Sequence, residues 1–393
     1  MNKVKLADIC KILNGYAFKS ANYISKGIRI IRITNVQNGY IEDNSPAFYP
    51  IERKSEIENY LLKKDDLLLS LTGNVGRVAL LPEEMLPAAL NQRVACLRLN
   101  DEKVCDKKFL YYCLNNNSFE RKCICSSKGI AQKNLSTEWL KSYKIELPEI
   151  NIQKKIVDTL DKLNKLIFYR NTQLRLLDDL VKSRFTELCG DPISNPFNWK
   201  KKKISEVCTK IGSGATPKGG KASYISEGIS LIRSMNVHNG YFKYDELAHI
   251  SENQAKELQN VCIEKNDVLL NITGASVARS CIVPNNILPA RVNQHVSILR
   301  ANLKILEPIF LNLVLINDNY QHYLLSISES NGATRQALTK QQIENLVIPI
   351  PPLECQSRMA CYFKRINKSK VEIQKSLDKL EMLKKSLMQQ YFG

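Results

Sequence analysis

The sequence contains no long hydrophobic run. The longest apolar stretch of its 393 residues covers positions 309–316 and includes Asn312, whereas a helix needs roughly 20 predominantly apolar residues to cross a bilayer. Positions 1–5 lead into no apolar segment either, so a secretory signal is not expected. These absences argue against a membrane or secreted protein, and we expect the chain to be cytoplasmic.

Metal-binding and disulfide patterns are also missing. The chain has 12 cysteines but no Cys-x-x-Cys pair, and the cluster of Cys113, Cys123 and Cys125 has none of the four histidines near it in sequence. A tetrahedral zinc site needs a better spacing of ligands. We expect reduced, mostly buried thiols, no metal site and no cofactor held by this chain.

Catalytic motifs are nearly absent. The Gly-Gly-Lys stretch at 219–221 has Ala215 where a phosphate-binding loop needs its first glycine. Asn-Pro-Phe-Asn at 195–198 resembles the Asn-Pro-Pro-aromatic motif of amino methyltransferases, but the second proline is missing and no glycine-rich cofactor loop precedes it, which favours a linker turn. The acidic pairs at 65–66 and 178–179 are interpreted as structural or solvated rather than as a nuclease metal site. We therefore expect no enzyme activity in the chain.

Positive charge is what the sequence has in excess. Lys and Arg number 57 against 39 Asp and Glu, which gives a formal net charge of +18. An excess of this size favours a polyanionic partner such as nucleic acid. The alternative is that lysine serves solubility over the whole surface.

The sequence also contains an internal repeat. Positions 27–40 recur as 228–241, and positions 68–73 recur as 269–274, both at an offset of 201. The Leu-Pro and Asn-Gln pairs within 86–92 return within 288–294, and the segment 144–148 matches 347–351 at an offset of 203. Four ordered matches at nearly one offset indicate a duplication, so the chain should contain two copies of one fold.

Each copy combines a globule with a long helix. Short β-like runs broken by Gly and Asn-Gly lie at 28–33, 66–71 and 94–99 in the first copy and at 229–233, 267–272 and 296–299 in the second. Helical patches lie at 107–114 and 308–316. The pattern predicts an α+β fold with globular domains at 1–148 and 191–351 and helical spacer segments at 149–190 and 352–393.

The two helical segments are expected to pair. Apolar residues recur at alternating steps of three and four from 152 to 188 and from 355 to 391, as in helices that bury one seam. Prolines precede both segments, and Gly190 and Gly393 follow them. Each helix would be roughly 50 Å long, more than one small domain can cover. We therefore expect an antiparallel coiled coil, the alternative being that each helix packs only on its own domain.

Polar residues that recur in the duplicated motifs are the candidates for DNA contact. Arginine and asparagine suit bidentate contacts with guanine and adenine, and hydroxyl- and glycine-rich turns that end in a cation suit phosphate. In the first copy the candidates are Lys19, Arg32, Asn35, Gln37, Thr72, Asn74, Arg77, Asn91, Gln92, Arg93, Lys128, Gln132 and Lys133. In the second copy they are Thr216, Lys218, Arg233, Asn236, His238, Thr273, Ser276, Arg279, Asn293, Gln294, His295, Arg335 and Gln336.

Each candidate has an alternative role as a cap or brace of its loop, because a shared fold keeps its scaffold as well as its binding site. Residues that read bases should differ between the copies if each copy reads a different sequence. The pairs that fit this expectation, weakly, are Lys19 with Lys218, Gln37 with His238, Asn74 with Ser276 and Arg93 with His295.

The order of globule, long helix, globule and long helix resembles the specificity (S) subunit of type I restriction-modification systems. The resemblance covers the whole chain: Pro-Glu-Ile-Asn-Ile-Gln and Pro-Pro-Leu-Glu-Cys-Gln introduce the helices and end at Gln153 and Gln356, and the Thr-Pro turn at 212–217 is similar to one in the family's target-recognition domain. The first copy has Gly-Tyr-Ala-Phe-Lys at 15–19 in place of that turn, and Cys355 replaces the usual glutamate.

This resemblance implies a non-catalytic subunit that recognises DNA. Each target-recognition domain would read one half of a bipartite double-stranded DNA target, and the helix pair would set the gap between the halves. The helices would also hold two methyltransferase (M) subunits, which bind S-adenosylmethionine, and restriction (R) subunits, which use ATP and Mg²⁺, would join them. The alternatives are a stand-alone DNA-binding regulatory protein and the recognition part of a fused methyltransferase or nuclease.

Overall fold

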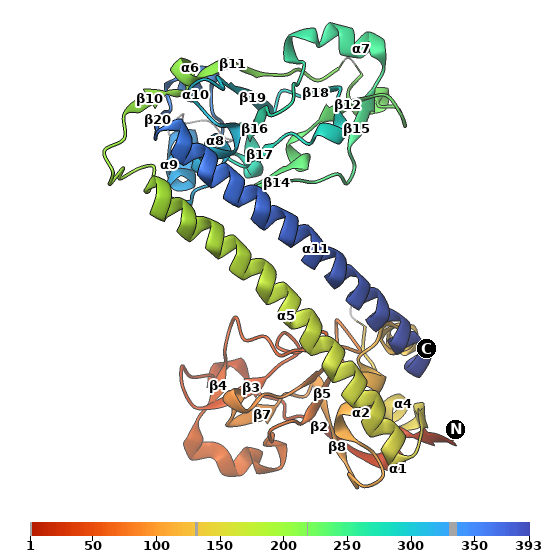
Figure 1. The fold of residues 1–393 in the computed structure, drawn as a ribbon. Coiled ribbons are helices and arrows are strands. Elements are labelled where there is room, and N and C mark those ends of the chain that lie inside the picture. The colour runs from red at the N-terminus through yellow and green to blue at the C-terminus, as the bar shows by residue number, and fades with distance from the viewer. Residues whose placement is uncertain (1, 130–132, 218, 330–335) are drawn as a thin grey trace. The chain divides into compact units, whose positions relative to one another are not determined.

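The structure is a computed structural model that describes residues 2–129, 133–217, 219–329 and 336–393. The chain divides into two compact units (Figure 1). Unit 1 consists of Met1–Asn171 with Lys375–Gly393, and unit 2 consists of Thr172–Gln374. Each unit therefore contains one globule, the start of one long helix and the end of the other.

The first globule contains a four-stranded sheet, a three-stranded sheet, a two-stranded pair and several short helices, of which α2 and α3 pack against one face of the four-stranded sheet. A four-stranded antiparallel sheet has the order β2-β8-β5-β6, and a three-stranded sheet has the order β4-β3-β7, in which β3 runs parallel to β7. Strand β1 pairs with β9 and joins the two ends of the globule. The elements are β1 (Asn2–Lys5), α1 (Leu6–Ile9), β2 (Cys10–Asn14), β3 (Ile28–Ile31), β4 (Phe48–Tyr49), β5 (Leu67–Ser70), β6 (Val78–Leu80), β7 (Ala88–Leu90), β8 (Val94–Leu99), α2 (Lys107–Leu114), α3 (Asn117–Ser126), α4 (Thr137–Ser142) and β9 (Lys144–Leu147).

The four-stranded sheet is the middle layer of this globule. Leu67 and Leu69 of β5 belong to the core that also contains Phe109 of α2 and Phe119 of α3, whereas Leu68 belongs to the core shared with the three-stranded sheet. Successive side chains of a strand point to opposite faces. Because both faces of β5 are buried, its sequence is a continuous apolar run instead of an alternating one.

The second globule repeats this plan. Its sheets have the orders β11-β19-β16-β17 and β15-β12-β18, and strand β10 pairs with β20. An additional hairpin joins β13 to β14. The elements are β10 (Lys201–Lys203), α6 (Ile204–Val207), β11 (Cys208–Ser213), β12 (Ile229–Ile232), β13 (Val237–His238), β14 (Tyr241–Phe242), β15 (Ala248–Ile250), α7 (Glu252–Glu257), β16 (Val268–Asn271), β17 (Ser280–Ile282), β18 (Ala290–Val292), β19 (Val296–Ala301), α8 (Pro308–Leu315), α9 (Asp318–Glu329), α10 (Lys340–Asn345) and β20 (Val347–Pro349).

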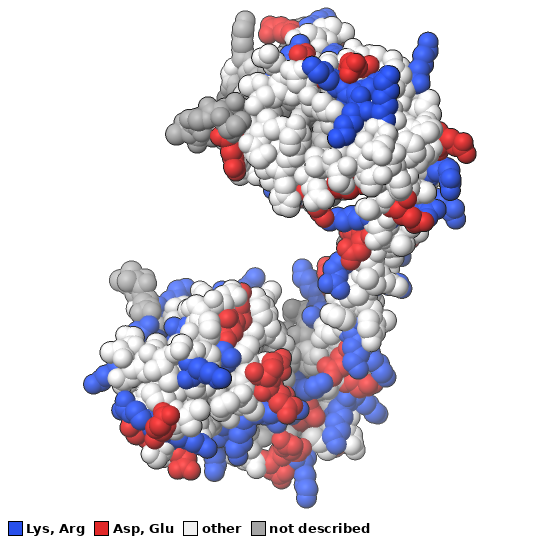
Figure 2. All heavy atoms as spheres, turned by 90° about the vertical axis from the view of Figure 1, so that its left-hand side faces the viewer, with Lys and Arg blue, Asp and Glu red and all other residues white. Residues whose placement is uncertain are grey.

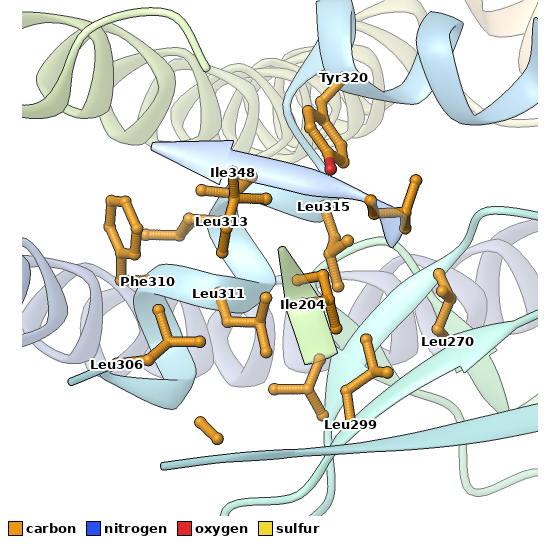
Figure 3. Packing of buried hydrophobic residues seen from close by; sticks show 14 of the residues in the cluster. Ile204, Leu270, Leu299, Leu306, Phe310, Leu311, Leu313, Leu315, Tyr320 and Ile348 are labelled. Carbon is orange, nitrogen blue, oxygen red and sulfur yellow. The ribbon is translucent and has the colours of Figure 1, made fainter. Parts of the chain in front are cut away.

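The longest apolar run of the sequence forms a helix in the core of the second globule. All eight residues of α8 are buried, as expected for a helix that is apolar on every side. Figure 3 shows Ile348 of β20 beside Leu313 of α8, in the cluster that also contains Phe310, Leu311 and Leu299. No helix in the described part of the chain is long and apolar enough to span a bilayer.

The two long helices are α5 (Ile150–Cys189) and α11 (Leu353–Phe392), each within two residues of the range expected from the sequence. In unit 1, Leu160 near the start of α5 shares a core with Leu387 near the end of α11. In unit 2, Met359 near the start of α11 shares a core with Phe185 near the end of α5. In both units the start of one long helix packs against the end of the other (Figure 1), which confirms the antiparallel pair.

Basic residues that interrupt the apolar seams are accommodated individually. In unit 2, Lys370 Nζ lies 2.6 Å from Asp178 Oδ1, and the Arg184 guanidinium lies 5.9 Å from the centre of the Tyr362 ring. In unit 1, burial lowers the pKa of Lys384. An ion pair holds Lys370 in the seam, and an aromatic ring lies beside Arg184.

A buried glutamine anchors each long helix to its globule. Gln153 Oε1 accepts the Asp106 N–H at 2.8 Å, and its amide donates to the carbonyls of Val104 at 3.0 Å and Pro148 at 2.7 Å. Gln356 repeats all three bonds: its oxygen accepts the Glu307 N–H at 2.9 Å, and its amide donates to the carbonyls of Ile305 at 3.1 Å and Pro351 at 2.8 Å. Both side chains are 0% exposed.

Of the acidic pairs interpreted as structural or solvated, Asp66 forms an ion pair with Arg98, and Asp267 holds the equivalent position in the second copy. Arg98 donates to both carboxylate oxygens of Asp66, at 2.9 and 2.6 Å, and Arg300 donates to both oxygens of Asp267, at 2.8 Å each. The same bidentate pair thus braces the four-stranded sheet in both copies.

Candidate nucleic-acid interface

The candidate motifs of each copy meet at one edge of the two sheets. Strands β3 and β7 are parallel neighbours, so Ile31 and Leu90 end side by side. Strand β5 is antiparallel to β8, so its end lies opposite the start of β8. Arg32, Thr72 and Asn91 follow or lie close to these strand ends. The topology therefore brings together motifs that are far apart in the sequence.

Backbone hydrogen bonds join four loops of the first globule into a continuous frame. We call it the first rim and define it as residues 15–19, 71–74, 91–93, 128–129 and 133–134. The bonds run from Gln92 N to Tyr16 O (3.0 Å), Leu71 N to Arg93 O (2.9 Å), Gly73 N to Lys133 O (2.9 Å) and Asn134 N to Lys128 O (2.9 Å).

The second globule has the same frame, the second rim, at residues 214–217, 272–276, 293–295 and 336–338. Its bonds run from Gly214 N to Asn293 O (3.2 Å), Ile272 N to His295 O (3.0 Å) and Gly274 N to Gln336 O (2.9 Å). Side chains add to this frame: the Thr216 hydroxyl donates to the Gln294 amide oxygen, and Thr273 Oγ1 lies 2.6 Å from His295 Nδ1.

A glycine permits the first loop of each rim to approach the third. A Cβ atom on Gly15 would lie 2.2 Å from the carbonyl carbon of Asn91, and one on Gly214 would lie 1.7 Å from the Val292 carbonyl oxygen. No larger residue fits at either position without moving backbone. Neither glycine was predicted to have a role, although a glycine precedes the corresponding loop in both copies of the sequence.

Several candidates present exposed side chains on or beside the rims. In the first copy these are Lys19, Asn74, Gln92, Arg93, Lys128 and Lys133. In the second copy Thr216 and Gln294 are exposed, and Thr273, Ser276, His295 and Gln336 are partly exposed, with the Gln336 amide donating to Glu329 Oε1 at 2.8 Å. These side chains have the hydrogen-bonding groups that reach base edges and phosphates.

Asn35 and Asn236 are buried and brace their own loops. Asn236 is 0% and Asn35 is 3% exposed. Each side-chain oxygen accepts the backbone N–H of the arginine three residues earlier, at 2.9 and 3.0 Å, and each amide donates to the backbone carbonyl seven residues later, at 2.8 and 3.0 Å. Both amides are thus engaged within their own loops, as in the bracing role that was the alternative for these residues.

Three further candidates, Thr72, Asn91 and Asn293, are buried residues of the rims themselves. Thr72 is 9% exposed and bridges to Asn134. The side-chain oxygens of Asn91 and Asn293 accept the N–H of the residue two positions later, at 3.2 and 3.1 Å. These residues shape the loops that carry Gln92 and Arg93 in one copy and Gln294 and His295 in the other.

The repeated arginines are held by the loops around them. Arg32 donates to the Ser45 carbonyl and Arg233 to the Glu246 carbonyl, at corresponding places in the two copies. Arg77 donates to the Gln37 side-chain oxygen, while the Gln37 amide donates to Thr34 O at 2.9 Å. The Nε atoms of Arg32, Arg77 and Arg233 are buried without a hydrogen-bond partner, which is uncommon in folded proteins.

The remaining candidates lie near these arginines or outside the described residues. His238 stacks on Tyr241 with ring centres 4.9 Å apart, and its Nε2 lies 3.2 Å from the Met235 carbonyl. Arg279 is partly exposed. Gln132, Lys218 and Arg335 lie outside the described residues.

Net charge alone does not mark the interface. On the face shown in Figure 2, Lys and Arg alternate with Asp and Glu over the first globule, and the second globule presents a broad area with few charged residues. Among the residues described, no group of three or more His, Cys, Asp and Glu side chains is placed to hold a metal ion. The rims are distinguished by their exposed polar side chains.

The sequence matches one family model twice. The model of the type I restriction modification DNA specificity domain matches residues 1–176 and 196–384. The specificity subunit of the type I restriction enzyme EcoBI from Escherichia coli is 24% identical over 380 residues, which cover 90% of this chain and 76% of that subunit. The putative type I restriction enzyme MjaX specificity subunit from Methanocaldococcus jannaschii is 24% identical over 415 residues, covering 98% of this chain and 91% of that one.

Two solved structures share the fold over the whole chain. The S subunit of a type I restriction-modification system from M. genitalium has a TM-score of 0.63 at 15% identity, covering 100% of this chain and 96% of that chain. The second structure comes from a study of complex assembly and conformational transition of the type I R-M system. It has a TM-score of 0.59 at 17% identity, covering 100% of this chain and 97% of that chain.

Proposed function

The chain belongs to the family of type I restriction-modification DNA specificity domains and is a non-catalytic recognition subunit, and from this premise we propose that each globule reads one half of a bipartite double-stranded DNA target through its rim. The observation that carries this proposal is that the two rims share one backbone frame but differ at their side chains. A shared frame with different side chains is what two readers of different sequences require.

The differences lie at equivalent positions. Arg93 in the first rim corresponds to His295 in the second, and Lys133 corresponds to Gln336 through the same backbone bond to a glycine. Arginine suits the two acceptors of guanine, whereas a glutamine amide suits adenine. The exposed lysines at 128 and 133 add contacts to phosphate, which contribute affinity and register without sequence information.

Replacing one exposed reader should affect one half of the target. We expect Arg93→Ala to weaken binding to the intact target by about 10- to 100-fold, because a bidentate base contact contributes roughly 1–3 kcal/mol. Base changes in the half read by the first globule should then reduce the binding affinity of the variant less than that of the unmodified chain. Base changes in the other half should reduce the affinity of both chains equally. Fluorescence anisotropy with duplexes altered in one half at a time measures both effects.

His295→Ala is the reciprocal variant, and Lys11→Ala is the control. Lys11 is exposed near the start of β2, at the end of that strand away from the rim. Equal losses for Arg93→Ala and Lys11→Ala would show that Arg93 acts only through general charge.

The long helices are proposed to set the gap between the half-sites and to hold two methyltransferase subunits, which supply S-adenosylmethionine, and through them restriction subunits, which use ATP and Mg²⁺. Large apolar side chains remain exposed on both helices, and such groups mark protein interaction sites. They include Leu166, Phe168, Tyr169, Leu176 and Leu180 on α5 and Val371, Met382 and Leu383 on α11.

Phe168 is the most exposed of these residues on α5, at 65%. We expect Phe168→Asp to reduce the methyltransferase subunit recovered with a tagged chain by about tenfold or more, because aromatic residues dominate protein interfaces. Asn151→Asp adds the same charge at an exposed position near the start of α5 and should leave recovery unchanged. Full recovery with Phe168→Asp would place the docking surface elsewhere.

A further inference from the structure

We propose that Cys189 and Cys355 are a redox-sensitive modification site, at which a peroxide converts two thiols into a disulfide that clamps the second globule to its two helices. This inference goes beyond DNA recognition and does not depend on it. It concerns residues of unit 2 only.

The two sulfur atoms are already in contact. Cys189 is the last residue of α5 and Cys355 lies in the first turn of α11, and their Sγ atoms are 3.9 Å apart. The Cys355 thiol donates to the Leu188 carbonyl at 3.2 Å, which holds it against the end of α5. A disulfide needs a separation of about 2.05 Å, so the sulfurs must approach by about 2 Å, a distance that side-chain rotation can supply.

The pair lies where the chain enters and leaves the second globule. Gly190, which follows the last residue of α5, has a φ of 80°, and the Trp199 indole donates to the Cys189 carbonyl at 2.9 Å. Helix α11 begins at Leu353, so the whole globule is the segment between the two thiols. A bond between the thiols would close this segment into a covalent ring.

In the described part of unit 1, the equivalent positions carry no pair of thiols. Helices α5 and α11 correspond at an offset of 203, so the positions equivalent to Cys355 and Cys189 are Ile152 and Phe392. Neither side chain can be oxidised to a crosslink. Oxidation at this site would therefore act on one of the two globules.

The chemistry balances with hydrogen peroxide as the oxidant. The Cys355 sulfur attacks one peroxide oxygen, an S–O bond forms, the O–O bond breaks, and the thiol proton leaves with the second oxygen as water. The Cys189 sulfur then attacks the Cys355 sulfur, an S–S bond forms, the S–O bond breaks, and a second water leaves. Two thiols lose two electrons, and the peroxide gains them.

Exposure determines the order of these steps. Cys355 is partly exposed, whereas Cys189 is 2% exposed, and burial raises the pKa of the Cys189 thiol. Cys355 is therefore the thiol that meets peroxide, and Cys189 is the resolving thiol.

Peptide mapping of the full-length chain tests the proposal. The reduced protein is treated with hydrogen peroxide, its remaining thiols are alkylated, and it is digested with trypsin without reduction. The tryptic peptides 185–200 and 341–358 contain Cys189 and Cys355 respectively and no other cysteine. We expect these peptides to be crosslinked in most chains, and we expect dithiothreitol to separate them.

Matched variants identify the sulfurs involved. Cys361→Ser removes an exposed thiol on α11 and should leave the crosslink intact, while Cys355→Ser should abolish it without disturbing the buried Cys189. Closure of so long a loop should also raise the unfolding midpoint of the oxidised chain by about 5 °C or more.

Three results would overturn the proposal. One is recovery of both peptides as separate alkylated or over-oxidised species. Another is persistence of the crosslink in Cys355→Ser. The third is a crosslink between labelled and unlabelled chains in an isotope-mixing experiment, which would show an intermolecular bond.

Discussion

Exchange of residues 1–148 for the corresponding domain of another specificity subunit is expected to change one half of the DNA sequence recognised and to leave the other half unchanged. Each rim is built from loops of its own globule, and the backbone bonds that frame it stay within that globule. The core beneath each rim is likewise formed within one unit. No contact of the second rim is therefore altered by the exchange.

The exchanged domain must keep the residues that pack on the helices. These include Phe109, which lies 5.5 Å from the Phe392 ring of α11, and Tyr112, whose hydroxyl donates to Asp161 of α5 at 2.5 Å. Exchange of residues 191–351 is the reciprocal experiment. Mapping of methylated sites in cells that also express the methyltransferase partner gives both outcomes, and a change in both halves after either exchange would refute independent reading.

Gln356→Ala is expected to lower the free energy of unfolding of unit 2 by about 3 kcal/mol or more. The substitution leaves the Glu307 N–H and the Ile305 and Pro351 carbonyls without their partner in a fully buried place. Each buried polar group left unsatisfied costs roughly 1–3 kcal/mol. Gln153→Ala should have the same effect on unit 1, because its three hydrogen bonds are equivalent.

Urea denaturation followed by hydrogen exchange of peptides from each unit measures this loss separately for the two units. Gln390→Ala is the control, since Gln390 is exposed on α11 and should change the stability by a few tenths of a kcal/mol. Stability of Gln356→Ala equal to that of Gln390→Ala would show that the glutamine does not anchor the helix.

The periodic parts of the fold were predictable from the sequence. The alternation of three and four along 152–188 and 355–391 identified both long helices, and helix α2 has the predicted bounds Lys107–Leu114. The duplication identified the repeat of the sheets. These features depend on local spacing of apolar residues, which the sequence displays directly.

The roles of individual polar residues were less predictable. Asn35 repeats as faithfully as Gln92, yet one is a buried brace and the other is exposed on the rim. The difference arises because the Asn35 side chain bonds to backbone of its own loop, and such side-chain-to-backbone bonds leave no distinct mark in the spacing. The repeated motifs identified the loops, but only the burial of each side chain distinguishes residues that brace a loop from residues that are exposed for DNA contact.

The division of the chain into units also depends on contacts that sequence spacing does not display. Helical segments at 149–190 and 352–393 were predicted beside the globules, and in the structure Lys375–Gly393 belongs to the same compact unit as the first globule. The reason is that Leu387 and Phe392 of α11 pack on the core of the first globule, more than 200 positions away in sequence. The glutamine anchors were missed for the same reason.

The central claim, that two equivalent rims read two separate halves of one target, is tested most directly by sequencing the methylated sites of cells that express this chain with its methyltransferase subunit. We expect every methylated site to contain two different short specified sequences separated by an unspecified gap of constant length. A single continuous recognition sequence, or a gap whose length varies among the methylated sites, would contradict the account.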